Sequence, residues 1–182
     1  MSKDSSKDSG KETKPPRTVK VDRAELDRIV DRSHHSPHTV HRHHPAKDGV
    51  TVRVLRPMAE AVVVVMDDGH RVTLRHEHRG VWAGVLPVKK VPDYRLDVTY
   101  GGRVIPADDP YRFLPTLGDL DMHLVAEGRH EELWRVMGAH VHTYDTPQGD
   151  VTGVSFAVWA PNARGVRVTG SFNHWDSLAH PM

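Results

Sequence analysis

Residues 49–64 read GVTVRVLRPMAEAVVV and residues 153–168 read GVSFAVWAPNARGVRV, and these two stretches decide the predicted fold. They align without a gap at a spacing of 104 positions. In each stretch, apolar residues alternate with other residues up to a proline, and a second apolar segment follows. Alternation with a period of two is typical of β-strands. We interpret the stretches as two copies of one strand–proline–strand module, the alternative being two unrelated pairs of strands that share valine and proline.

The first copy belongs to a region, residues 49–105, that consists of short strand patterns. Residues 62–65 are a continuous apolar run that suits the interior of a sheet. Turn sequences occur at 67–69 (DDG) and at 101–102 (GG). About six or seven short strands with frequent turns are typical of an immunoglobulin-like antiparallel β-sandwich. The predicted fold class is therefore all-β, with this first sandwich, a short leading helix and a histidine-rich loop at residues 21–110.

The second copy marks a second, shorter domain. Strands are expected at 154–159 and from Val166 to Gly170. At the spacing of the two copies, Met182 corresponds to His78, so we expect the second β-sandwich, at residues 146–182, to be incomplete. A helical connector is expected at residues 111–145. Residues 1–20 contain almost nothing apolar and are expected to form a disordered tail.

Composition narrows the class of protein. The chain has 182 residues and a hydrophobic content of 37%, which suits one domain or two small ones. Its formal net charge of +1 gives no reason to expect a nucleic acid or a membrane as partner. It has no cysteine, which excludes disulfides and thiolate zinc sites. Without a membrane-spanning apolar run or a signal-peptide pattern, the chain is expected to be cytoplasmic.

A histidine-rich segment is a candidate for a metal site in the sequence. It holds six of the 15 histidines: His34, His35, His38, His41, His43 and His44. Imidazoles ligate zinc, copper or nickel. Metal ligands usually come from separate elements, however, and Pro37 and Pro45 indicate a loop. We expect no bound metal and no cofactor, and we keep a metal-binding sandwich as an alternative.

Four motifs follow one another along the chain: DPYRF at 109–113, GAH at 138–140, FAVWAPNA at 156–163 and FNHWD at 172–176. In this order and spacing, they resemble the amino-terminal region of bacterial glycogen branching enzymes. These are the 1,4-α-glucan branching enzymes of the α-amylase superfamily. The resemblance implies a first β-sandwich module followed by the start of a family-48 carbohydrate-binding module, with a catalytic barrel encoded downstream.

Catalysis by this chain alone is not expected. Branching enzymes are similar to retaining glycosidases, which need two carboxyl groups about 5 Å apart on a barrel of about 250 residues. The expected tail, sandwich, connector and partial sandwich already account for all 182 residues. The chain also lacks a Gly-x-Ser-x-Gly nucleophile motif. The sequence therefore predicts no catalytic residue.

Glucan binding is the chemistry that these residues can support. Sugars place their apolar faces on aromatic rings, while amides and carboxylates bind the hydroxyl groups. Trp175 lies close in the sequence to Asn173 and Asp176 and offers both kinds of group. Trp159 and Trp82 are further candidates for exposed contact residues. For each tryptophan, packing in a core or between domains is the alternative.

Three functions remain open at this stage. The first is the amino-terminal region of a branching enzyme, with glycogen or malto-oligosaccharide and a downstream catalytic barrel as partners. The second is a free-standing α-glucan-binding module, and the third is a structural or metal-binding β-sandwich. The resemblance favours the first function.

Overall fold

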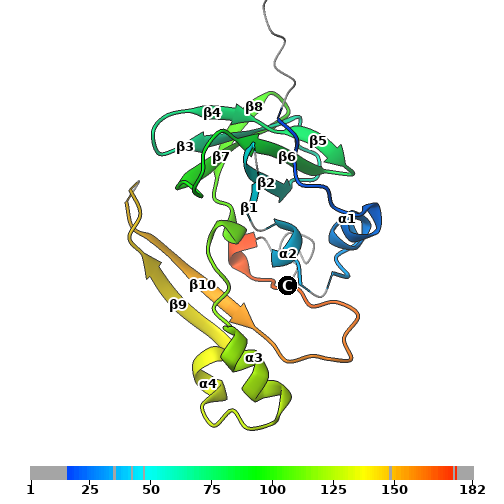
Figure 1. Ribbon diagram of the computed structural model, residues 1–182, viewed down its shortest axis with the longest axis vertical. Helices are drawn as coiled ribbons and strands as arrows, with labels where there is room; N and C mark the ends of the chain where they lie inside the picture. Colours follow the sequence, from blue (N-terminus) through cyan, green and yellow to red (C-terminus); the bar gives the residue numbers. More distant parts are fainter. Residues whose placement is uncertain are drawn as a thin grey trace, which may run out of the picture.

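The computed structural model describes residues 16–34, 36–41, 43–46, 48–147, 149–173 and 175. It shows a β-sandwich, a short helical segment and a separate two-stranded hairpin (Figure 1). The predicted fold class, mainly antiparallel β-sheet with few helices, is confirmed. Residues 1–15 of the predicted tail lie outside the described residues.

Two four-stranded antiparallel sheets form the sandwich. One sheet has the strand order β1-β2-β6-β5 and the other has the order β4-β3-β7-β8. The strands are β1 (His44–Ala46), β2 (Gly49–Leu55), β3 (Ala61–Met66), β4 (Arg71–Thr73), β5 (Arg75–His78), β6 (Val81–Leu86), β7 (Tyr94–Tyr100) and β8 (Arg103–Ala107). The strand patterns between residues 49 and 105 are thus confirmed. The short β1 is an addition, because Pro45 predicts a loop there.

The core lies between the two sheets. The inward residues of β2 and β3 are almost fully buried: Val50, Val52, Val54, Val62 and Val64. Burial of one valine side chain stabilises the fold by about 1.5–3 kcal/mol, so this pattern is a strong folding signal. The chain passes from one sheet to the other at Pro57. The strand–proline–strand module in this copy is therefore a crossover between sheets.

The outer face of β2 is also buried. Thr51 and Arg53 point away from the inter-sheet valines, yet both are fully buried. The Arg53 guanidinium donates to both carboxylate oxygens of Glu77, at 2.5 and 2.9 Å, and to the carbonyl of Val19 at 2.8 Å. The segment before the first helix therefore covers this strand. Its Val19 carbonyl accepts one hydrogen bond from the buried Arg53 guanidinium.

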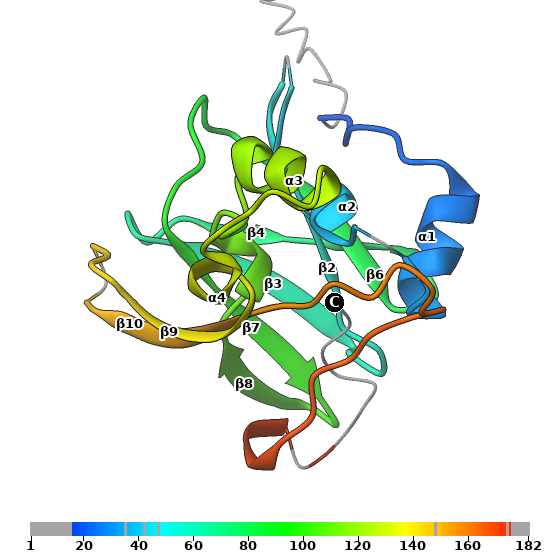
Figure 2. The ribbon, with the colours of Figure 1, turned by 90° about the horizontal axis from the view of Figure 1, so that it is seen from below.

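Helices α1 (Arg23–Val30) and α2 (His38–His41) lie on the sheet that contains β2 and β6 (Figures 1 and 2). Asp22 caps α1 and accepts a hydrogen bond from the backbone of Ala24. Leu26 and Ile29 of α1 form a second buried cluster with Val40 of α2 and Val81 of β6. The predicted leading helix is confirmed, and its apolar stripe docks on the sandwich.

The remaining elements follow the sandwich in the chain. They are η1 (Pro110–Arg112), α3 (Asp119–Ala126), α4 (Leu133–Val136), β9 (Gly138–Tyr144), β10 (Val151–Ala157) and η2 (Ser171–Asn173). The predicted connector, 111–145, contains the helices α3 and α4, but its last part is the strand β9. In Figure 1, α3 and α4 lie at the end of the molecule away from the sandwich.

The strand that pairs with β10 differs from the prediction. β10 pairs with the preceding β9, so that Val154 lies opposite Val141. Residues 166–170, expected to form the second strand of this copy, contain only an isolated bridge residue at Arg167. The turn between β9 and β10 is closed locally by Thr146 Oγ1, which donates to the carbonyl of Gly149 at 2.7 Å. A hairpin forms between strands that are neighbours in the sequence. This explains why β10 pairs with β9 and not with residues 166–170.

Candidate functional site

Trp82 lies in the core of the sandwich. Its side chain is 8% exposed and belongs to the main buried cluster. Its indole Nε1 donates to the carbonyl of Arg56 at 3.2 Å, and its ring meets the edge of His76 at a centroid distance of 5.3 Å. The expectation that Trp82 is exposed is wrong, because β6 is buried on both faces. Its position agrees with the alternative of core packing.

The other two candidate tryptophans lie on the surface of the last segment. Trp159 follows β10 and is 60% exposed, and Trp175 is 70% exposed. The backbone N–H of Trp175 donates to the carbonyl of Gly170 at 2.9 Å and closes the turn around η2. Asn173 is the last residue of η2, and Asp176 lies outside the described residues.

Phe172 is an exposed aromatic residue in the same turn, and the sequence did not single it out. A Cβ atom added to Gly170 would lie 2.6 Å from Cε1 of Phe172, so the ring lies directly against the glycine backbone. Figure 2 shows η2 on the outside of the molecule. After β10, the described residues therefore present three aromatic side chains to solvent, those of Trp159, Phe172 and Trp175.

A buried hydrogen-bonded chain lies where the first sandwich meets the connector. The Tyr94 hydroxyl donates to Oδ2 of Asp109 at 2.6 Å, and Nε2 of His43 lies 2.9 Å from the same hydroxyl. Since the hydroxyl proton is used toward Asp109, Nε2 of His43 is assigned as the donor to the hydroxyl oxygen. Oδ1 of Asp109 accepts from the backbone of Tyr111 at 3.1 Å. Burial raises the pKa of Asp109, and burial followed by the charge of Asp109 raises the pKa of Tyr94.

The histidine-rich segment packs on Tyr111 of the DPYRF motif. The rings of His41 and Tyr111 stack with centroids 4.5 Å apart, and His38 meets the edge of Tyr111 at 5.0 Å. Nδ1 of His41 lies 3.1 Å from the carbonyl of Arg53, so this nitrogen carries the proton of the neutral ring. Burial lowers the pKa of His41 to about 4. The histidine-rich segment and the DPYRF motif, which lie far apart in the sequence, thus form one structural unit.

Arg112 of the same motif connects this unit to the hairpin. Its guanidinium donates to Oδ1 of Asp93 at 2.5 Å and lies over the ring of Phe113 at 4.6 Å. Phe113 stacks on Tyr144 of β9 with centroids 4.6 Å apart and an interplanar angle of 21°. Tyr144 in turn stacks on His142 at 6.0 Å. These four side chains, Arg112, Phe113, Tyr144 and His142, form the aromatic column.

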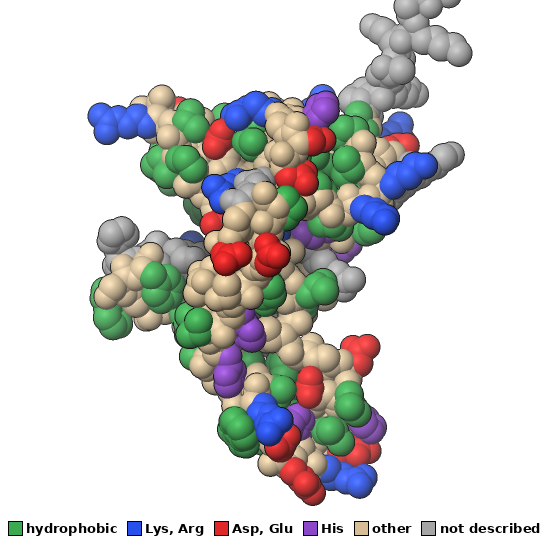
Figure 3. Space-filling view, turned by 90° about the vertical axis from the view of Figure 1, so that its left-hand side faces the viewer, with side chains coloured by type: hydrophobic (Ala, Val, Ile, Leu, Met, Phe, Trp, Pro, Cys, Tyr) green, Lys and Arg blue, Asp and Glu red, His purple; other side chains and the backbone are tan. Residues whose placement is uncertain are grey.

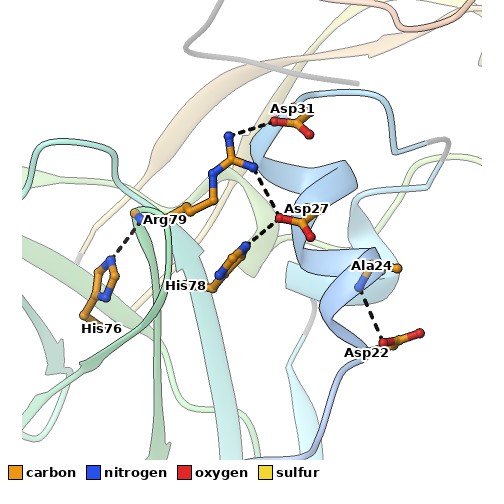
Figure 4. Close-up of polar contacts among 8 residues, drawn as sticks. Asp22, Ala24, Asp27, Asp31, His76, His78 and Arg79 are labelled. Atoms are coloured by element: carbon orange, nitrogen blue, oxygen red, sulfur yellow. Dashed lines mark hydrogen bonds and ion pairs between the residues drawn. The ribbon is translucent and has the colours of Figure 1, made fainter.

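The turn between β5 and β6 holds α1 through ion pairs (Figure 4). Nε2 of His78 lies 2.6 Å from Oδ1 of Asp27. Arg79 bridges Asp27 and Asp31 at 3.2 and 3.1 Å. The hydrogen bond from His78 lowers the pKa of Asp27. These contacts dock the helix on the first sandwich.

Two further observations apply to the residues that the structure describes. In this part of the chain, no group of three or more histidine, aspartate or glutamate side chains is gathered to hold a metal ion. Within the same residues, no helix is long and apolar enough to cross a membrane.

Two family models match the chain on either side of the connector. The model for the N-terminal domain of alpha-1,4-glucan branching enzyme GlgB matches residues 22–111, which include α1, α2 and the sandwich. The model for carbohydrate-binding module 48, also described as the isoamylase N-terminal domain, matches residues 136–182. The second match contains β9, β10 and the two exposed candidate tryptophans, Trp159 and Trp175. The domain borders 21–110, 111–145 and 146–182 stay a prediction.

Curated relatives point the same way. Over 160 residues, the chain is 58% identical to the 1,4-alpha-glucan branching enzyme GlgB of Thermobifida fusca, covering 87% of this chain and 21% of the relative. Over 169 residues, it is 51% identical to GlgB of Rhodococcus jostii, covering 92% of this chain and 23% of the relative. The chain thus spans about a fifth of the length of these relatives.

A solved pullulanase from Bacillus acidopullulyticus is 23% identical over 38% of this chain and 10% of that chain. Its TM-score of 0.34 is too low to carry an argument. The similarity to branching enzymes therefore rests on the family models and the curated relatives. The chain is thus similar to the amino-terminal region of 1,4-alpha-glucan branching enzymes GlgB, with a match to the GlgB N-terminal domain followed by a match to carbohydrate-binding module 48.

Proposed function

We propose that this region binds α-glucan and positions it for a branching reaction, in which a segment of 1,4-α-glucan is transferred to form an α-1,6 branch. The observation that carries the proposal is the exposure of Trp159 and Trp175 inside the match to carbohydrate-binding module 48. An exposed indole offers an apolar face for a pyranose ring and an N–H donor for a hydroxyl group. The transfer step is assigned to a catalytic barrel of the same enzyme.

The proposed contact residues are Trp159, Trp175 and the two neighbours of Trp175 with amide and carboxylate groups, Asn173 and Asp176. Trp82 is omitted because its ring lies in the core. One short contact surface binds a single oligosaccharide weakly. A polymer such as glycogen gains apparent affinity because it presents the same epitope many times.

A free-standing α-glucan-binding module is the second candidate function. It would use the same exposed aromatic residues and differ only in having no attached barrel. The identity of 51–58% to branching enzymes favours the first function.

Removal of the exposed indole is expected to weaken glycogen binding. Trp175→Ala should lower the apparent affinity for glycogen about two- to tenfold, because an aromatic contact contributes on the order of 0.5–1.5 kcal/mol. The measurement is co-sedimentation of the purified chain with glycogen over a range of glycogen concentrations. Trp159→Ala is expected to act in the same direction.

Trp134→Ala is the matched control. Trp134 is 68% exposed, almost the same as Trp175, but it lies in α4, outside the match to the carbohydrate-binding module. Its replacement should leave co-sedimentation unchanged. Equal losses for Trp134→Ala and Trp175→Ala, or no loss for Trp175→Ala and Trp159→Ala, would contradict the proposed contact surface.

A further inference from the structure

A shallow, open cavity of about 300 Å³ lies at the seam between the first sandwich and the β9–β10 hairpin. Three segments line it: residues 91–93 between β6 and β7, Arg112 with Phe113, and residues 144–147 at the end of β9. Figure 3 views the side of the molecule on which the turn of this hairpin lies. Residues 91–93 lie in the first family match, residues 144–147 lie in the second, and Arg112 and Phe113 lie between the two matches, so the cavity is complete only while Tyr144 of the hairpin stays stacked on Phe113.

The walls of this seam cavity are held in place by interactions that do not involve a ligand. Phe113 and Tyr144 belong to the aromatic column, in which each ring is stacked on its neighbour. The Arg112 side chain is 4% exposed and pairs with Asp93 at 2.5 Å and with Asp108 at 3.4 Å. A preformed wall lowers the entropic cost of ordering side chains when a ligand binds.

The charges of the seam cavity favour a neutral ligand with hydroxyl groups. Its lining contains two carboxylates, Asp93 and Asp145, and one guanidinium, Arg112, so an anionic ligand would face net negative charge. Asp93 is already paired with Arg112. The Asp145 side chain is exposed, and the structure places no hydrogen-bond or ion-pair partner on it among the described residues. Its carboxylate is therefore available to accept hydrogen bonds from hydroxyl groups.

The apolar part of the lining suits the C–H faces of a sugar. Val91, Pro92 and Pro147 contribute aliphatic surface beside the two rings. A sugar ring carries both C–H groups and hydroxyl donors, so it matches the combination of aliphatic surface and free carboxylate. The volume lies at the lower end of the range of small-ligand sites, about 300–1,000 Å³, which restricts the ligand to a short saccharide.

We propose that the seam cavity is a second α-glucan site, which takes a short maltosyl stretch with Asp145 as its hydroxyl acceptor. This inference rests on the proposed function and extends it to residues outside the exposed tryptophans. Since both walls are needed, a bound saccharide stabilises the docking of the hairpin on the sandwich. Binding of a glucan chain thereby fixes the orientation of the two modules.

The test is a titration of the ¹⁵N-labelled 182-residue chain with maltotriose, followed through backbone amide shifts. The amides of Asp145, Thr146 and Phe113 are expected to move together with one dissociation constant. Asp145→Asn should raise this dissociation constant about tenfold, since it removes a charge-assisted hydrogen-bond acceptor. Asp150→Asn is the matched control, because Asp150 is an exposed aspartate next to the same hairpin and does not line the cavity.

Trp175→Ala separates this inference from the proposed function. It should reduce glycogen co-sedimentation and leave the maltotriose constant at the Asp145 amide unchanged. If maltotriose moves no cavity amide, or if Asp145→Asn and Asp150→Asn bind equally well, the seam site is overturned while glycogen binding through Trp175 still stands. If wild-type chain does not co-sediment with glycogen either, the proposed function fails together with the seam site.

Discussion

Arg112→Met is expected to lower the free energy of unfolding by about 3–5 kcal/mol, the cost of breaking a buried ion pair from one side. The Arg112 guanidinium is 4% exposed, and its partner Asp93 is also largely buried. The variant leaves the Asp93 carboxylate without its cation in a poorly solvated position. It also removes the donor to the carbonyl of Tyr94 and the cation that lies over Phe113. Urea unfolding at pH 7 measures the loss.

Arg79→Met is the control for this prediction. Arg79 also pairs with two aspartates, Asp27 and Asp31, but its side chain is 54% exposed. Solvent screens such a pair, and its removal leaves no buried charge. The loss in Arg79→Met should therefore be much smaller than the loss in Arg112→Met. Similar losses in the two variants would contradict the role assigned to burial.

A double variant identifies the source of the effect. Arg112→Met combined with Asp93→Leu removes both charged partners, so no buried carboxylate remains unpaired. We expect it to recover a large part of the stability that Arg112→Met loses. A double variant as unstable as the single one would assign the loss to the contacts of Arg112 with Phe113 and Tyr94.

The first sandwich could be predicted from the sequence because its strands have one face against the core. In β2, Val50, Val52 and Val54 face the core, which is the alternation that the sequence displays, and in β3 the continuous apolar run 62–65 supplies the buried Val62 and Val64. The helix α1 could be predicted for the same reason, since its cap at Asp22 and its apolar stripe are local features.

Features that depend on distant contacts could not be predicted. Arg53 occupies an alternate position in β2, yet it is buried because Glu77 and Val19, 24 and 34 residues away, cover it. Trp82 is buried because β6 is covered on both faces. The strand β9 could not be predicted because it contains His140 and His142, and histidine is not a strong strand-forming residue.

The candidate sites also differ in whether they depend on local sequence or on contacts between distant residues. Trp159 and Trp175 were found from residue type and motif, and the structure places both on the surface. The seam cavity could not be found in this way, because its lining residues come from three separate segments. The pairing of Arg112 with Asp93 and the packing of Phe113 on Tyr144 bring those segments together.

Acidification from pH 7.5 to pH 5 is expected to cost about 2 kcal/mol of stability through His41 alone. Burial lowers the pKa of His41 from its ordinary value of 6.5 to about 4 in the folded chain. Between these two values, the unfolded chain binds a proton and the folded chain does not. The stabilising contribution is therefore complete above pH 6.5 and is lost as the pH falls toward 4.

The surroundings of His41 explain why its charged form is disfavoured. The ring is stacked on Tyr111, and Nε2 has no hydrogen-bond partner among the described residues. The charges of Arg56 and Arg53 add to the effect of burial, and so does His38 when it is protonated. A proton on Nε2 would place a cation in a buried position without an acceptor.

Urea unfolding of wild type and His41→Phe at pH 7.5 and pH 5 tests this assignment. Phenylalanine can keep the ring stacked on Tyr111 but loses the hydrogen bond to the Arg53 carbonyl, so this variant should be less stable than wild type at pH 7.5. Its loss of stability between the two pH values should be about 2 kcal/mol smaller than that of wild type. His123→Phe, which replaces an exposed histidine of α3, should retain the wild-type loss.

The comparison of wild type with His41→Phe also removes the contribution of Asp109 to the pH dependence of stability. Burial raises the pKa of Asp109, so the folded chain gains stability from this group as the pH falls, which is opposite to the effect of His41. Since Asp109 is present in every variant, the difference between wild type and His41→Phe isolates the histidine. An equal loss of stability in these two proteins would show that His41 is not the buried neutral group that opposes acidification.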